Sequence, residues 1–240
     1  MNNILIEKEK VINIKDNSNL FIETNEMKDI IIGNNCNIVI NIIDISSKLK
    51  VNYNITINDN SVLTIIRGCL FTGVEENIKI MLKGVNSKIE YKFVSFVKGN
   101  ALYNIECDHL NNNTISNIIC NGVSVRNYSL KFNIISEVEK GIKGCSINQV
   151  SKIRVFGDGK CEANPILKIG EMDTMAHHAT SIGRFSDEEL FYLKSRGLNH
   201  TEAVKLLIGG FFNEIINDFN EKSRKKFLSL MDSEVKGIEY

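Results

Sequence analysis

Short stretches in which apolar and polar residues alternate run through the first two thirds of the chain. Examples are NIVINIIDI, KLKVNYNITI and SVLTIIRG, at residues 37–45, 48–57 and 61–68. They are rich in β-branched residues, and Asn, Asp, Gly and Ser separate them, as in NDNS and KGN. This pattern predicts many short strands that each bury one face. An apolar period typical of helices is absent before about residue 172.

A chain of many short strands with asparagine and glycine corners has two common folds, the β-sandwich and the β-solenoid. In a solenoid, each coil buries its inward side chains against the next coil. No repeat of fixed length is visible in the sequence. Periodicity alone therefore leaves both folds open.

The last part of the chain has a helical pattern instead. Ser186 followed by Glu189 is a capping box, which predicts a helix over about 187–196. Gly197 then fits the left-handed position just after a helix end.

Two further helices are predicted downstream. Asn199 is a second N-cap, with Glu202 at the position that completes it. A third amphipathic helix is expected over about 221–235. The apolar stripe of the second helix comprises Val204, Ile208, Phe211, Ile215 and Phe219.

The amino-acid composition argues against some classes of function, such as nucleic-acid binding. Lys+Arg and Asp+Glu both count 29 in 240 residues, and this balance argues against a general nucleic-acid binder. The charged start MNNILIEKEK is unlike a signal peptide, and no apolar run has the length of a membrane span. The six cysteines form no CxxC pair. We therefore expect a cytoplasmic protein with reduced thiols that binds neither nucleic acid nor membranes.

Several motifs in the second half of the chain have a recognisable pattern. They are HLNNNTISNIICNGV (109–123), NPILKI (164–169), HATSIGRF (178–185), DEELFYLKSRGL (187–198) and EAVKLLIGGFFNEII (202–216). With these motifs the chain resembles a known family, the SufB/SufD scaffolds of iron–sulfur cluster assembly. The resemblance implies a right-handed parallel β-helix followed by a small C-terminal helical domain, which we expect over residues 1–172 and 173–240.

Within this family the chain is most similar to SufD-like members. SufB-like chains have a cysteine where this chain has Ile169, and a glutamate where it has Ala179. SufD-like chains keep the histidine alone, at the position of His178. Some of them carry a cysteine at the position of Ala176. The resemblance makes His178 the candidate ligand for iron or for an iron–sulfur cluster.

The function implied by the resemblance is that of a non-catalytic scaffold subunit. It would pair with a SufB-like chain, share a transient iron–sulfur cluster with it, and dock a SufC-like ABC ATPase with its helical domain. This chain has no G-x-x-x-x-G-K-[ST] motif, so we expect it to bind no nucleotide itself. The residues expected to contact a partner are Leu190, Tyr192, Arg196 and Phe211.

Two other functions stay open on the sequence. One is a solitary homodimeric scaffold, because the edge strands of a β-helix need covering. The other is a β-helix enzyme acting on polysaccharides, which would need clustered carboxylates. Tryptophan is absent and the Asp residues are scattered, which disfavours the enzyme.

Other potential ligands have an ordinary structural explanation. On a strand, Cys107 and His109 would share one face, but two ligands do not close a metal site. Cys145 and Cys161 could supply thiolates near the histidine motif, or simply be small buried residues. His177, beside His178, is expected to have no role of its own.

Overall fold

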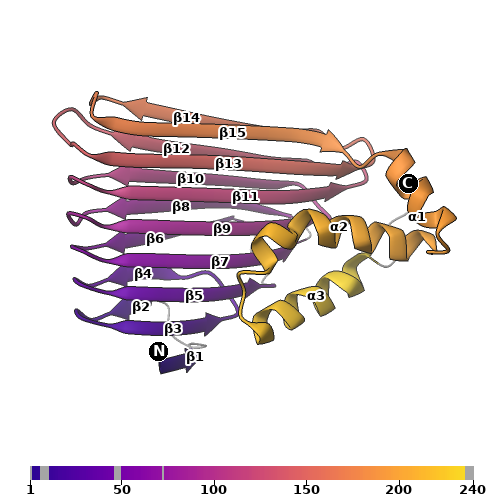
Figure 1. Ribbon diagram of the computed structural model, residues 1–240, viewed down its shortest axis with the longest axis horizontal. Coiled ribbons are helices and arrows are strands. Elements are labelled where there is room, and N and C mark those ends of the chain that lie inside the picture. Colours follow the sequence, from indigo (N-terminus) through magenta and orange to yellow (C-terminus); the bar gives the residue numbers. More distant parts are fainter. Residues whose placement is uncertain (1, 6–10, 46–49, 72, 236–240) are drawn as a thin grey trace.

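The computed structural model describes residues 2–5, 11–45, 50–71 and 73–235, and its main body is a parallel β-solenoid (Figure 1). The remaining positions, among them the first two of the strand predicted at 48–57, lie outside the described residues. The described strands form an eight-stranded and a seven-stranded sheet. Within each sheet, strands from successive coils pair in parallel. The predicted parallel β-helix is thus confirmed.

The chain alternates between the two sheets, so odd-numbered strands form one sheet and even-numbered strands the other. The first, sheet A, comprises β1 (Asn2–Leu5), β3 (Asn19–Thr24), β5 (Asn37–Asp44), β7 (Val62–Phe71), β9 (Lys88–Val97), β11 (Ile115–Val125), β13 (Cys145–Phe156) and β15 (Thr174–Arg184). The second, sheet B, comprises β2 (Val11–Ile14), β4 (Asp29–Ile32), β6 (Lys50–Ile57), β8 (Val74–Leu82), β10 (Ala101–His109), β12 (Leu130–Val138) and β14 (Cys161–Ile169).

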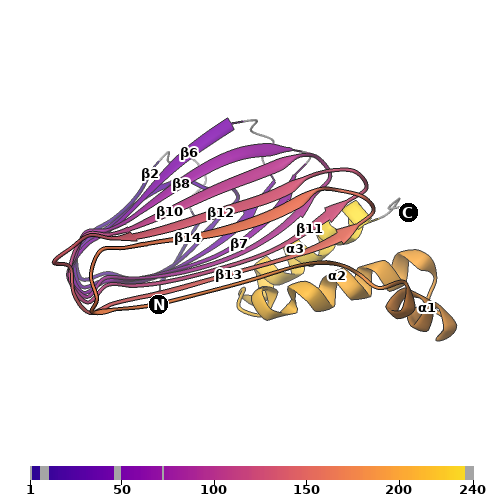
Figure 2. The ribbon, with the colours of Figure 1, turned by 90° about the horizontal axis from the view of Figure 1, so that it is seen from above.

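The two sheets meet along one narrow corner and diverge away from it (Figure 2). Asparagines in the left-handed conformation, with φ of 53° to 59°, turn the chain at this corner. Asparagine tolerates this conformation better than other residues with a side chain. The recurrent asparagines in the sequence therefore supply the left-handed turns between sheet B and sheet A. They are Asn17, Asn35, Asn60, Asn86 and Asn113.

The coils grow longer along the chain, which explains why the sequence has no fixed repeat. A ladder of asparagine side chains on sheet B joins equivalent positions of successive coils. The separation is 25 residues from Asn52 to Asn77 and 27 from Asn77 to Asn104. It is 29 from Asn104 to Asn133 and 31 from Asn133 to Asn164. Each of these coils thus adds two residues to the one before.

Three helices follow the last strand: α1 (Asp187–Ser195), α2 (His200–Ile216) and α3 (Glu221–Val235). Both predicted capping boxes are present, at Ser186 and Asn199. Gly197 has the predicted positive φ, at 96°. None of the helices in the described part of the chain is long and apolar enough to cross a membrane.

The helices return along the solenoid, where α2 and α3 pack on the outer face of sheet A (Figures 1 and 2). In Figure 2, none of the described helices covers the outer face of sheet B. The buried side of α2 includes Val204, Ile208 and Phe212. Phe211, which we predicted within the apolar stripe, is only half-buried. The strand β15 lies beyond residue 172, so the solenoid extends into the segment that we assigned to the helical domain.

Candidate functional site

The C-terminal end of the solenoid is open. Strands β14 and β15 are the last in their sheets, and within the described part of the chain each has a neighbouring strand on one side only. Nearly every residue of β15 is exposed, whereas alternate residues of its neighbour β13 are buried. Ile169 and Ile182, which face the interior side of this last coil, are 39% and 47% exposed. Free edges of this kind are usually covered by another chain or element.

His178 lies on this open coil. His178 lies in the middle of β15, and the first helix begins only at Asp187. Its register partner on β13 is Gln149, which is buried in the core. Register partners in a parallel sheet point to the same face, so His178 is on the interior side and His177 on the outer side. Both histidines are exposed.

Neither cysteine near this motif is an exposed thiolate. Cys145 is buried and lies beneath Thr174 in the register. Its Sγ is 3.3 Å from Thr114 Oγ1. Cys161 is half-buried on β14, and burial raises the pKa of its thiol. Neither thiol is therefore as accessible to a metal as the exposed ring of His178.

Cys107 and His109 share an interior face, as predicted, but they form a closed polar cluster. The His109 ring is buried, with Nδ1 2.7 Å from Thr114 Oγ1 and Nε2 2.8 Å from Ser116 Oγ. Burial lowers the pKa of His109 to about 4 and raises the pKa of Cys107 to about 12. Both groups are neutral near pH 7, and both ring nitrogens are engaged. The cluster therefore serves the fold and leaves no open ligand position.

The four residues expected to contact a partner lie in different environments. Leu190 is buried in the core of the chain, and Phe211 is half-buried. Tyr192 is 55% exposed, and the Arg196 guanidinium lies 5.2 Å from the centre of its ring. Phe191, which the sequence analysis did not select, is 74% exposed. The surface that α1 offers is therefore formed by Phe191, Tyr192 and Arg196.

A groove between α2 and α3 extends the apolar surface of the helices. Gly209 and Gly210 are among the residues that line it, and a Cβ atom at either position would meet nothing within 4 Å. The groove depends on how α3 packs against α2. Apolar side chains that line it are Leu198, Leu206, Leu228 and Met231.

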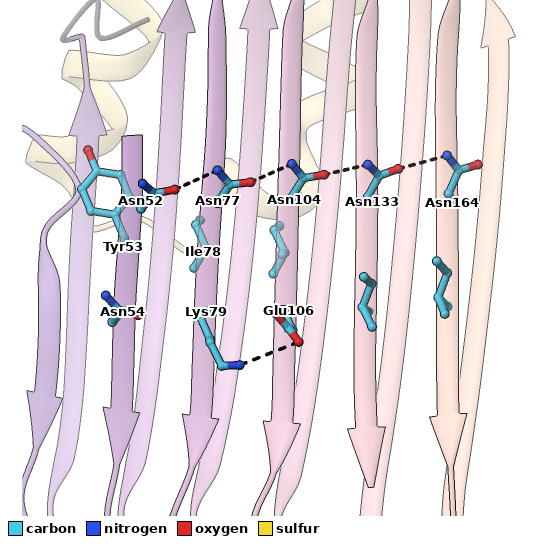
Figure 3. A pocket seen from close by; sticks show the side chains of 13 residues that line it. Asn52, Tyr53, Asn54, Asn77, Ile78, Lys79, Asn104, Glu106, Asn133 and Asn164 are labelled. Atoms are coloured by element: carbon cyan, nitrogen blue, oxygen red, sulfur yellow. Dashed lines mark hydrogen bonds and ion pairs between the residues drawn. The ribbon is translucent and has the colours of Figure 1, made fainter. Parts of the chain in front are cut away.

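The uncovered face of sheet B carries the asparagine ladder, shown in Figure 3. Its side-chain amides are joined by hydrogen bonds of 2.7 to 3.0 Å. The ladder asparagines line a groove on this face, and Glu106 is the one carboxylate among the described residues that line it. Its oxygen lies within 4.8 Å of oxygens of Asp108 and Glu137. Lys79 is 2.9 Å from Asp108 and Lys168 is 3.0 Å from Glu137, so lysines of neighbouring coils offset part of the charge of these three carboxylates.

Comparisons with known proteins show the family to which this chain belongs. The family described as "SUF system FeS cluster assembly, SufBD core domain" matches residues 6–211. The chain is 36% identical over 121 residues to the iron–sulfur cluster assembly protein SufD of Bacillus subtilis, covering 50% of this chain and 28% of that protein. It is 43% identical over 77 residues to a SufBD family protein of Mycobacterium leprae, covering 31% and 19%.

A more distant relative is a chloroplastic SufBD family protein of Arabidopsis thaliana, 24% identical over 131 residues. The match covers 54% of this chain and 23% of that protein. In all three comparisons the chain spans less than a third of the relative's length. The family match extends from the first coils into α2. The chain therefore belongs to the SufBD core family of the SUF iron–sulfur cluster assembly system, and it is similar to SufD.

Proposed function

We propose that this chain is a non-catalytic scaffold subunit of an iron–sulfur cluster assembly complex. The open coil of β14 and β15 would pair with a SufB-like chain. The exposed surface of the helices would dock a SufC-like ABC ATPase. The cluster under assembly is the cargo, held transiently between the two scaffold chains, and His178 would be the contribution of this chain.

The open end of the solenoid is the observation that supports pairing most directly. Two strand edges are free there, and the interior residues Ile169 and Ile182 are exposed. A second β-helix could add a strand to each edge and cover these side chains in one step. Because His178 lies on the same coil, it would face the partner across that interface.

The helical surface supports a separate docking site. Phe191 and Tyr192 are large exposed aromatic side chains close to Arg196. Aromatic residues and arginine are enriched in the residues that dominate binding energy at interfaces. These residues lie on α1 and at its C-cap, not on the open strand edges, so two partners could bind the chain independently.

Single substitutions can separate the two interfaces. We would co-express the chain with a SufB-like and a SufC-like chain and determine the mass of the purified complex. Ile182→Asp is expected to abolish pairing with the SufB-like chain, because it places a charge at the open end. Phe191→Asp is expected to abolish ATPase docking and leave the pairing intact. Ile31→Asp is the matched control, since Ile31 is 41% exposed on the outer face of sheet B.

The alternative is a homodimer that uses the same open end. In that case the chain alone would elute with the mass of two copies, and Ile182→Asp would convert it to a monomer. Failure to recruit a SufB-like chain, together with such a dimer, would replace the proposed heteromeric complex by the solitary scaffold. Complexes of wild-type composition from both Ile182→Asp and Ile169→Asp would reject the open end as the interface.

A further inference from the structure

Gln149 lies directly beneath His178 in the interior of the solenoid. The two residues are partners in the parallel register of β13 and β15. Gln149 has no exposed surface, although only one coil lies beyond it. The residue of β15 that stands over it is His178, on the same face of the sheet.

The contacts of Gln149 fix the orientation of its amide. Nε2 lies 2.7 Å from Ser136 Oγ and 3.4 Å from the carbonyl oxygen of Ile166. A carbonyl oxygen only accepts hydrogen bonds, so the NH₂ group must point toward Ile166. Oε1 is therefore an acceptor, and it is buried without a donor among the described residues.

A buried acceptor without a donor is unfavourable, and the last coil is the place from which a donor can come. Ala176 has no donor in its side chain, and Thr180 stands over Ser151 instead. His178 stands over Gln149 and carries a ring N–H. Because its side chain is exposed, the ring is free to turn toward Oε1.

We propose that Gln149 is a positioning residue for His178. Its Oε1 accepts a hydrogen bond from one ring nitrogen and holds the neutral imidazole in one tautomer. The other ring nitrogen keeps its lone pair and is presented at the open end. Histidines that bind metals usually donate their second N–H to such an acceptor, which orients the ring. The use of this arrangement rests on the proposed function, in which His178 is offered to the cluster.

The test determines which tautomer the His178 ring adopts in the isolated full chain. The ¹⁵N chemical shifts of labelled histidine distinguish the two tautomers at a pH where the ring is neutral. His178→Asn assigns the signal. The wild-type chain should show a single tautomer. Gln149→Leu should shift the signal to the mixture of free imidazole, and Gln149→Glu, which keeps an acceptor, should restore one tautomer. Asn148→Leu is the matched control, because Asn148 lies beneath His177.

A free-imidazole mixture in the wild-type chain would overturn the proposal, and this result needs no variant to fold. An unchanged His178 signal in a folded Gln149→Leu chain would overturn it as well. In the complex with partners, Gln149→Leu should lower iron affinity by about 10- to 100-fold. If no complex or cluster forms, the proposed function is wrong, but the tautomer measured in the isolated chain is unaffected. The two experiments therefore test the function and the positioning of His178 separately.

Discussion

Arg67 and Glu76 form a two-point ion pair inside the solenoid. Arg67 Nη1 donates to Glu76 Oε1, and Nη2 donates to Oε2 at 2.8 Å. Nη2 also donates to Asp44 Oδ2 at 2.9 Å, and Tyr91 OH lies 3.2 Å from Nη1. The three charged side chains are at most 1% exposed. One guanidinium thus bridges two carboxylates that are shielded from water.

Arg67→Met is expected to destabilise the fold by about 3–5 kcal/mol, because it breaks a buried ion pair by removing the guanidinium that Glu76 binds at two points. Urea unfolding followed by circular dichroism would measure the change. The triple variant Arg67→Met, Asp44→Asn, Glu76→Gln removes all three charges and should recover a large part of the loss. A loss below about 1 kcal/mol in the single variant would mean that the pair contributes little.

His109 should make the fold sensitive to acid. Burial lowers the pKa of this side chain to about 4, against about 6.5 in an unfolded chain. The unfolded state therefore binds more protons between these values, so the free energy of unfolding falls as the pH drops from about 6.5 to 4. The full effect is about 3 kcal/mol. His109→Gln does not titrate, and the stability difference between the two chains should change across this pH range. A constant difference would contradict the assignment.

Gly68 sets how closely α3 approaches sheet A. A Cβ atom at this position would lie 2.5 Å from Phe227 Cδ2. Gly68→Val is expected to destabilise by about 1–3 kcal/mol through overpacking. Adding Phe227→Leu should cost less than the sum of the two single changes. Gly209→Ala is the matched control: a Cβ atom there meets nothing within 4 Å, and alanine should stabilise α2 by about 1 kcal/mol.

The asparagine ladder should contribute measurably to stability. Asn104 donates to Asn77 and accepts from Asn133, so Asn104→Ala removes two amide hydrogen bonds. We expect a loss of about 1–2 kcal/mol in thermal or urea unfolding. Asn54→Ala, on the same face but outside the ladder, should stay within about 0.5 kcal/mol of the wild type. Equal losses for both variants would show that the ladder itself contributes nothing.

The sequence predicted the helices well because their signals are local. Ser186 and Glu189 are three residues apart and bond each other's backbone, and so do Asn199 and Glu202. The strands were also visible through their alternation. The choice between sandwich and solenoid was not visible, because the coil length changes from 25 to 31 residues. It was the family resemblance that selected the correct fold.

The surroundings of the candidate ligand depend on register, which no local pattern contains. Gln149 and His178 are brought together by the pairing of β13 with β15. Shifting that pairing by one residue would turn His177 inward instead. In the same way, Leu190 and Phe191 are adjacent in the sequence, and only the packing of α1 decides which of them is exposed.

The packing of the helices along sheet A affects how the protein unfolds. A solenoid whose coils touch only their neighbours can fray one coil at a time from either end. Here Asn220 donates to Asn41, 179 residues away, and Lys222 to Glu23, 199 residues away. The earliest coils are thus bonded to the start of the last helix. We expect unfolding to be a single cooperative event, and the N-terminal coils gain this protection during synthesis only after Asn220 and Lys222 have left the ribosome.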